Sequence, residues 1–209
     1  MDILRFLSNT FKLYAFDDKA YEDIIKNFNY KDILVLYLIF SFFTMLIPMI
    51  LVDVSLISVG YMIGVIVFIP ILILLFLYIS GGLFHFFIKL FGGKADLNSF
   101  FKVLIAVAIP MQIFNFVYNV FNYLMKISVD NVSIISNIIF SILMLCFYVY
   151  ALIVGIRYYA KVHKTGCGAV IGAMVVVLIL LLLIVVVISL LFFSFFMIAS
   201  TSTVPVIAG

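Results

Sequence analysis

The chain has 209 residues, of which 68% are hydrophobic and only 10% are charged. A soluble domain is nearer half apolar and a quarter charged, so lipid must solvate most of this surface and the chain is predicted to be an integral membrane protein. A net charge of +3 is too small to indicate nucleic-acid binding, and no segment is polar enough for a separate soluble domain.

The N-terminal residues 1–32 are predicted to be a cytoplasmic amphipathic tail. Residues 2–15 and 17–28 each place apolar side chains on one helical face and charged or polar side chains elsewhere. Two short amphipathic helices on the membrane surface would explain this pattern, and docking against the bundle or a partner is the alternative. No unbroken apolar region with a cleavage site is present, so the first span is expected to act as the insertion signal.

Residues 33–198 are predicted to form one all-α membrane domain with five transmembrane helices. Each of five apolar runs reaches the roughly 20 residues that a helix needs to cross a bilayer, and no alternation typical of a barrel is visible. The predicted spans are 33–52, 56–79, 100–125, 132–159 and 168–198. A short external tail, 199–209, would follow the last span.

The basic residues indicate the orientation. The tail before the first span carries five, and the connections after the second and fourth spans carry three each. The remaining connections carry one between them, Lys126, and the C-terminal tail carries none. By the positive-inside rule the N-terminus is cytoplasmic and the C-terminus external. The bias towards Ile, Lys, Asn and Phe further points to a prokaryotic cell membrane.

An interfacial segment, 81–98, is predicted between spans two and three, where the chain reads GGLFHFFIKLFGGKADLN. Its aromatic and aliphatic residues recur at helical spacing, with His85 and Lys89 on another face. The glycine pairs suggest turns at either end. We expect a short helix at the interface or an extension of span two, followed by Asn98 or Ser99 as a helix cap.

The cytoplasmic face is the first candidate binding surface. Segments 83–94 and 157–164 carry cations that could hold anionic membrane lipids or a membrane partner, and His85 could be an ordinary polar-face histidine or a proton site. The candidate residues are His85, Lys89, Lys94, Arg157, Lys161 and Lys164. A homo-oligomer or another membrane protein is a further possible partner.

A polar stripe along the third span is the second candidate site. Amide side chains recur there at spacings of three and four, and the fourth span carries polar side chains at a spacing of four, namely Ser133, Asn137 and Ser141. The stripe consists of Gln112, Asn115, Asn119, Asn122 and Asn137. Such amides could hydrogen-bond between helices, or they could line a groove for a lipid headgroup or a small polar solute.

No pattern typical of an enzyme is found. The sequence has no zinc-binding HExxH, nucleophile elbow, phosphate loop or pair of carboxylates inside the membrane. Cys146 and Cys167 have no metal-ligand neighbours at useful spacing. We therefore expect no catalytic activity, no metal and no cofactor.

The stretch from the aromatic segment to the third span resembles the signature of the Yip family, which includes the Ypt/Rab-interacting proteins. The resemblance rests on a phenylalanine-rich run, Gly92 and Gly93, a polar turn, and small apolar residues ending at Pro110. LYAFDDKAYEDI and GIRYYAKVHKTGCGAVIGAMVV are similar to other parts of the family. The chain departs from the family at AVAIP, where an aromatic residue is common, and at Asp17-Asp18, where a proline is common.

The resemblance implies a five-span protein with a cytoplasmic N-terminus, in agreement with the charge distribution. It also implies a non-enzymatic role in organising membrane or binding membrane partners through the basic cytoplasmic face. The alternative is a transporter-like or lipid-handling protein with a polar groove between helices three and four.

Overall fold

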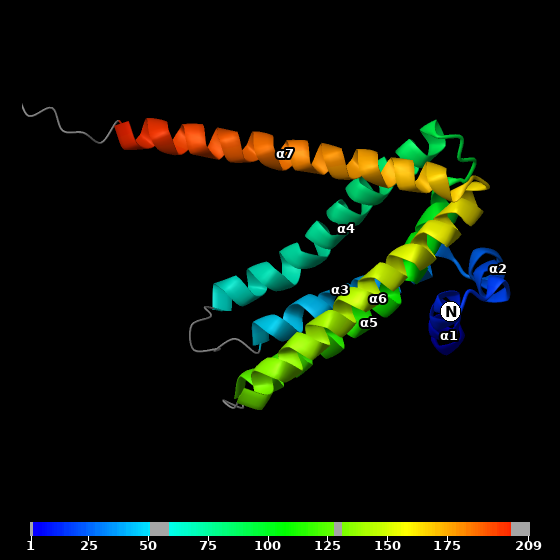
Figure 1. The fold of residues 1–209 in the computed structure, drawn as a ribbon, viewed down its shortest axis with the longest axis horizontal. Coiled ribbons are helices and arrows are strands. Elements are labelled where there is room, and N and C mark those ends of the chain that lie inside the picture. The colour runs from blue at the N-terminus through cyan, green and yellow to red at the C-terminus, as the bar shows by residue number, and fades with distance from the viewer. Residues whose placement is uncertain (1, 51–58, 128–130, 202–209) are drawn as a thin grey trace, which may run out of the picture.

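The computed structural model describes residues 2–50, 59–127 and 131–201, and within them every regular element is a helix (Figure 1). Two short helices precede five long ones. They are α1 (Ile3–Tyr14), α2 (Asp18–Asn27), α3 (Tyr30–Ile50), α4 (Val59–Leu90), α5 (Leu97–Ile127), α6 (Asn131–His163) and α7 (Cys167–Thr201).

Four of the long helices contain segments that are long and apolar enough to cross a membrane. These segments are Phe68–Leu90, Leu97–Tyr123, Ser136–His163 and Cys167–Leu190. They overlap the predicted second to fifth spans, the second of which continues to Leu90 instead of ending at residue 79, so a multi-pass helical membrane protein is confirmed. The first predicted span falls on α3, whose side chains are described only as far as Thr44, and a fifth span there stays a prediction. Residues 51–52, 56–58 and most of the external tail lie outside the described residues.

The segment 81–98 continues span two rather than forming a separate helix. Gly81 and Gly82 lie inside α4, which runs without a break to Leu90. A Cβ atom on Gly81 would approach Phe101 Cε1 to 2.7 Å and Leu104 Cδ2 to 2.9 Å. This glycine therefore allows α4 and α5 to pack closely. The cap of α5 is Asp96, whose carboxylate accepts from Ser99 N–H at 2.9 Å, instead of Asn98 or Ser99.

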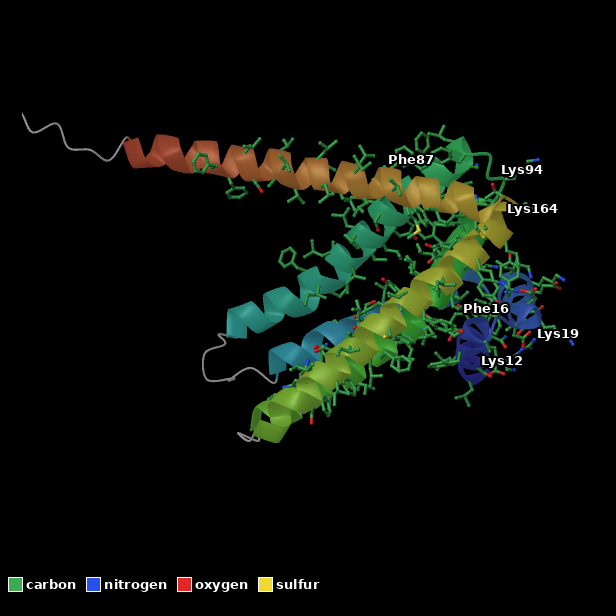
Figure 2. All side chains as sticks on the ribbon, in the orientation of Figure 1. Lys12, Phe16, Lys19, Phe87, Lys94 and Lys164 are labelled. Atoms are coloured by element: carbon green, nitrogen blue, oxygen red, sulfur yellow. The ribbon has the colours of Figure 1, made fainter. Side chains whose placement is uncertain are left out.

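The centre of the fold is α5, which packs lengthwise between α3 and α6. Helices α4 and α7 contact each other at one end of the molecule, from which α7 runs away from the bundle while α4 stays in contact with α3 and α5 (Figure 1). The short helices α1 and α2 lie at this same end, together with the α4–α5 and α6–α7 connections. We call this the basic end, because Lys12, Lys19, Lys94 and Lys164 all lie there (Figure 2).

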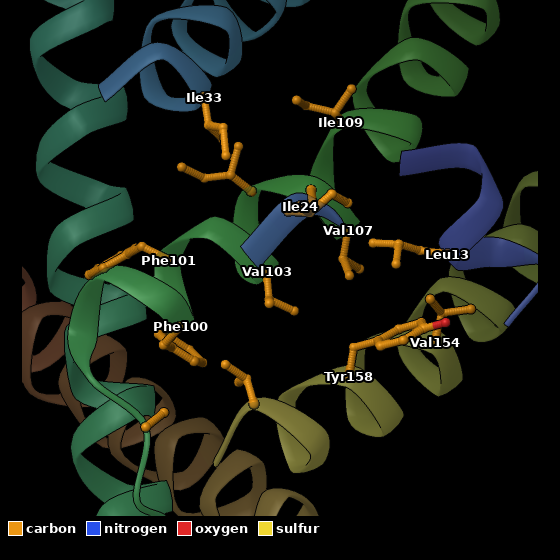
Figure 3. Close-up of a cluster of buried hydrophobic side chains, with 14 of the residues drawn as sticks. Leu13, Ile24, Ile33, Phe100, Phe101, Val103, Val107, Ile109, Val154 and Tyr158 are labelled. Carbon is orange, nitrogen blue, oxygen red and sulfur yellow. The ribbon is translucent and has the colours of Figure 1, made fainter. Parts of the chain in front are cut away.

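The main core also lies at the basic end. It consists of apolar side chains from all seven helices, and part of it is drawn in close-up in Figure 3. Its fully buried members include Leu13, Ile24, Ile33, Phe100, Phe101, Val103, Ile105, Ile109, Val154 and Tyr158. Leu13 and Ile24 come from α1 and α2, so both short helices contribute their apolar sides to this core instead of leaving them to the membrane alone.

Polar contacts fix the two short helices to each other. The Asp17 carboxylate accepts from the backbone N–H of Lys19 at 2.8 Å and starts α2. The guanidinium of Arg5 on α1 forms an ion pair with Asp23 on α2, which also accepts from the Asn9 amide. The pair α1–α2 is therefore one small unit seated on α5 and α6.

Replacing Leu13 by Ala should loosen this unit. Leu13 is fully buried, and removing a buried leucine side chain costs about 2–5 kcal/mol. Leu4 on the same helix is 81% exposed, so Leu4→Ala is the matched control. We expect a lower midpoint of thermal unfolding and faster proteolysis within residues 2–28 for Leu13→Ala only. Equal behaviour of the two variants would contradict the docking of α1.

Candidate functional site

At the basic end the α4–α5 turn is fastened to the last turn of α6. The backbone N–H of Lys94 donates to the carbonyl oxygen of His163 at 2.8 Å. This bond joins two loops that are about seventy residues apart in the sequence. It brings Lys94 next to Lys164, and both side chains are exposed (Figure 2).

The chain's two histidines face each other directly beneath this bond. His85 Nδ1 on α4 lies 3.3 Å from His163 Nε2 on α6, so one ring donates an N–H to the other. His85 is 7% exposed and His163 is fully buried. The Phe100 ring packs against both imidazoles, with centroid distances of 5.1 and 5.3 Å. The pair thus ties α4 to α6 inside an aromatic cluster.

This position differs from the one expected for His85. The sequence places it on a lipid- or partner-binding face, whereas its side chain points inward to His163. His163 was not among the candidate residues. The signal available was the count of histidines, since only two occur in the chain and a buried imidazole needs a polar partner.

The glycine pair at 92–93 has two separate physical roles. Gly92 has a φ of +94°, which side chains rarely adopt, and its N–H closes the end of α4 on the Lys89 carbonyl at 3.0 Å. A Cβ atom on Gly93 would lie 2.5 Å from His163 Nδ1 and 2.9 Å from the Ile88 carbonyl oxygen. Gly92 therefore makes the turn, and Gly93 lets it approach the histidine.

Pro110 lies within one helical turn of the point where α1 is anchored to α5. It lies buried inside α5 and has no N–H to donate to the carbonyl four residues earlier. At this point the adjoining carbonyl, that of Val107, accepts a hydrogen bond from the Tyr14 hydroxyl of α1 at 2.8 Å. A proline in the middle of the helix thus coincides with a polar anchor for the N-terminal unit.

Two of the candidate cations are engaged inside the protein. Lys161 Nζ lies 2.9 Å and Arg157 Nη2 3.5 Å from the Asp18 carboxylate of α2. The Arg157 guanidinium also lies 4.9 Å from the centre of the Phe16 ring, and the Lys161 ammonium 4.7 Å from that of Tyr21. These two cations hold the N-terminal unit on α6.

The hydrogen bond from Lys161 lowers the pKa of the Asp18 carboxyl below its usual value. The stability that this ion pair contributes is therefore present above the unfolded pKa, about 3.9. It is lost as the pH falls through the lower folded pKa. Because the partners are about half exposed, the contribution is modest, on the order of 0.2–1 kcal/mol.

The other three candidate cations are Lys89, Lys94 and Lys164. All three are exposed, and none forms an ion pair within the described part of the chain. Lys164 has a φ of +52° at the end of α6, where glycine is the usual residue. A lysine in this conformation costs about 1–2 kcal/mol relative to glycine. The folded chain is therefore less stable with lysine at position 164 than it would be with glycine there.

The polar stripe divides between two neighbouring helices. The Gln112 amide donates to the Ser41 hydroxyl of α3. The Asn115 carbonyl accepts from the Tyr148 hydroxyl of α6. These two stripe residues thus form hydrogen bonds between helices, and Gln112 faces α3 instead of α6.

The remaining stripe residues lie farther from the basic end. Asn122 hydrogen-bonds the Tyr118 hydroxyl, which lies 3.2 Å from the Ser141 hydroxyl of α6. Asn119 is half-buried. The Asn137 carbonyl oxygen is buried and has no hydrogen-bond partner among the described residues. The side chain of Ser133 lies outside the described part.

Among the described residues, no group of three or more His, Cys, Asp or Glu side chains could hold a metal ion. The site is instead a packed junction of helix ends with three exposed lysines around it. Together with the four membrane-length helices, it defines a multi-pass helical membrane protein with a basic end.

The chain belongs to the Yip1 domain family. The family's model matches residues 11–187, which span α3 to most of α7 together with the end of α1 and all of α2. The resemblance drawn from Gly92, Gly93 and Pro110 is therefore confirmed. Comparison with curated proteins and with solved structures gave no match.

Alanine at the turn should separate the roles of its glycines. Gly93→Ala should cost about 3 kcal/mol, because the new Cβ meets a buried imidazole and a backbone carbonyl. Gly92→Ala meets no atom within 4 Å and should cost about 1–2 kcal/mol through its positive φ. Gly82→Ala, inside α4 and also in open space, should cost nothing. Thermal unfolding in detergent measures all three, and a Gly93→Ala variant as stable as Gly82→Ala would rule out the close contact.

Proposed function

We propose that this protein is a non-enzymatic five-span membrane protein that organises membrane through its basic end, by binding anionic lipid headgroups. In this proposal α3 is the first span, and the basic end is cytoplasmic. The charge distribution supports this orientation, because eleven of the twelve Lys and Arg residues belong to α1, to α2, to two connections at this end, or to the adjoining ends of the long helices.

The observation that carries the proposal is the convergence of three exposed lysines, from the last turn of α4 and from the α4–α5 and α6–α7 connections. The Lys94–His163 backbone bond and the histidine pair hold these parts of the chain together, so the backbone that carries the cations needs no ordering when a ligand binds. Preorganised cations lose less entropy on binding than those on mobile loops. A basic residue near an anionic leaflet contributes about 1 kcal/mol.

The N-terminal unit supports the same assignment. Its apolar residues are not all covered by the bundle, since Ile3, Leu4 and Phe11 are 48%, 81% and 44% exposed. Such a patch on α1 suits the boundary between headgroups and acyl chains. We therefore propose that α1 and α2 lie in the leaflet interface with one side on the bundle and the other in lipid.

Neutralising the three exposed lysines should weaken the retention of anionic lipid. The test variant is Lys89→Gln/Lys94→Gln/Lys164→Gln. The control is Lys12→Gln/Lys19→Gln/Lys31→Gln, which removes the same charge from exposed sites on the N-terminal unit and α3. At about 1 kcal/mol for each lysine, the test variant should retain anionic lipid on the order of a hundredfold less well.

Native mass spectrometry of protein released from mixed anionic and zwitterionic membranes gives this measurement. Equal retention by the two variants would refute the assignment of lipid binding to Lys89, Lys94 and Lys164, and no preference for anionic lipid in the unmodified chain would refute the proposed function. Unchanged thermal unfolding would show that both variants are folded.

A second candidate function is transport through a polar groove. A cavity of about 410 Å³ lies between α3, α4 and α5, and its lining includes Tyr37, Ser41, Thr44, Gln112 and Asn115. This position differs from the predicted groove between the third and fourth spans, which are α5 and α6. Several polar groups around one cavity within the membrane could accommodate a small polar solute or a lipid headgroup.

Flux through this groove would depend on Gln112 and Asn115 but not on Asn119, which is outside the cavity lining. The leading proposal predicts that liposomes with the purified protein show neither lipid scrambling nor solute leak. Flux that Gln112→Leu/Asn115→Leu abolishes and Asn119→Leu preserves would instead establish the second function. Flux that neither variant changes would exclude this groove as the pathway.

A further inference from the structure

Helix α7 diverges from α4 and leaves a cavity between the two helices. Helix α7 packs on the rest of the protein only near its start, where Val170 and Ala173 are fully buried. Beyond these residues α7 runs away from α4 (Figure 1). The open side of this wedge must be filled by whatever surrounds the protein in the membrane.

The wedge contains a cavity of about 500 Å³, lined by residues of α3, α4, α5 and α7. Buried Leu77 and Gly81 of α4 form its floor, and exposed Phe76 and Leu178 lie at its rim. This volume is in the range of about 300–1,000 Å³ that small-molecule sites occupy.

The lining of the cavity is mostly apolar and therefore favours a hydrocarbon ligand. Its polar side chains are Tyr37 and Ser80, and the Ser80 hydroxyl already donates to the Phe76 carbonyl at 2.6 Å. A polar solute would lose its hydration there with almost no hydrogen bonds in return. A protein helix about 10 Å across fills roughly 420 Å³ per turn. The cavity could therefore hold little more than one turn of a partner's helix, which makes a helix a poorer fit than an acyl chain.

The depth of the cavity matches the acyl chains of one leaflet. Its residues on α4 begin at Phe84 and extend to Phe76, about 9–21 Å from the end of α4 at Leu90. Its residues on α7 run from Met174 to Leu181, about 10–21 Å from Cys167. The two helices thus give the same range of depths. This range is centred at about 15 Å, which is the thickness of half of a hydrocarbon core.

The three exposed lysines lie at the end of the molecule from which this wedge opens. The Phe91 ring at the end of α4 faces Gly172 of α7, since a Cβ there would lie 3.6 Å from the ring. Lys89 is in the last turn of α4, and the Lys94–His163 bond brings Lys94 next to Lys164 just before α7. Three exposed cations therefore lie at the end of the molecule where α4 and α7 meet, and a chain-sized cavity opens from the same end.

We propose that the wedge between α4 and α7 is a specific site for one anionic phospholipid. One acyl chain fills the cavity, and the phosphate is held by Lys89, Lys94 and Lys164. The headgroup part of this site rests on the proposed function, whereas the chain part stands on the cavity itself. The experiment below separates the two.

The probe is a phosphatidylglycerol with a diazirine midway along one acyl chain, and its zwitterionic counterpart is a phosphatidylcholine with the same chain. Each is added to nanodiscs holding the full-length protein, irradiated, and located by peptide mass spectrometry. We expect insertion into 76–84 and 174–181 to exceed insertion into 182–190 several-fold. Phosphatidylglycerol should label these segments more strongly than phosphatidylcholine.

Filling the cavity should abolish this labelling. Val177 lines the cavity and Val187 is 53% exposed on the same helix, so Val177→Trp and Val187→Trp form a matched pair. We expect at least a fivefold loss for Val177→Trp and no change for Val187→Trp. Ala108→Phe, which fills the cavity from α5, gives the same test if Val177→Trp unfolds.

Labelling spread evenly along α7, or labelling that neither Val177→Trp nor Ala108→Phe reduces, would show ordinary surface lipid and overturn the site. A second outcome is that the cavity variants abolish the labelling, but that phosphatidylglycerol and phosphatidylcholine label the unmodified chain equally. This outcome would overturn the headgroup assignment, and with it the proposed function. The chain site would remain in that case. Loss of the phosphatidylglycerol preference in the Lys89/Lys94/Lys164→Gln variant supports both parts.

Discussion

The basic end depends on the close approach of the α4–α5 turn to the last turn of α6. One backbone hydrogen bond, from Lys94 to His163, makes this junction, and the histidine pair beneath it joins the same two helices. Both require a residue without a Cβ at position 93. Because the turn is fixed in this way, the lysines on either side of it are fixed as well, and α7 starts from a defined place beside α4.

The N-terminal unit divides the cations of this end into two groups. Arg157 and Lys161 would be available to lipid if α2 were absent, but Asp18 occupies both. The Tyr14 hydroxyl fixes the same unit to α5 beside Pro110. The surface left for an anionic ligand is therefore smaller than the count of basic residues suggests, and it lies on the α4–α7 side.

The sequence predicts the long helices well, because twenty apolar residues in lipid have few alternatives to a helix. It also locates the turn at Gly92 and Gly93, but the turn predicted from the other pair, Gly81 and Gly82, is wrong because both lie inside α4. It does not predict which side chains meet across the bundle. Gln112 and Asn115 are three residues apart, about 60° around the helix. Because of that difference, Gln112 hydrogen-bonds to α3 and Asn115 to α6. The partner of His85 lies 78 residues away and depends on how α4 and α6 pack.

Helix α7 shows why lipid belongs to the description of this fold. Its apolar residues surround the helix on all sides, so no periodicity directs one face towards the protein, and beyond its first turns its side chains are largely exposed. In a bilayer, such a helix is positioned by its anchored end and by the hydrocarbon packed against it. The anchored end here is the junction of Phe91 with Gly172. An acyl chain in the wedge would supply the contacts that α4 and α5 do not, and would thereby couple the angle of α7 to the lipid bound at the basic end.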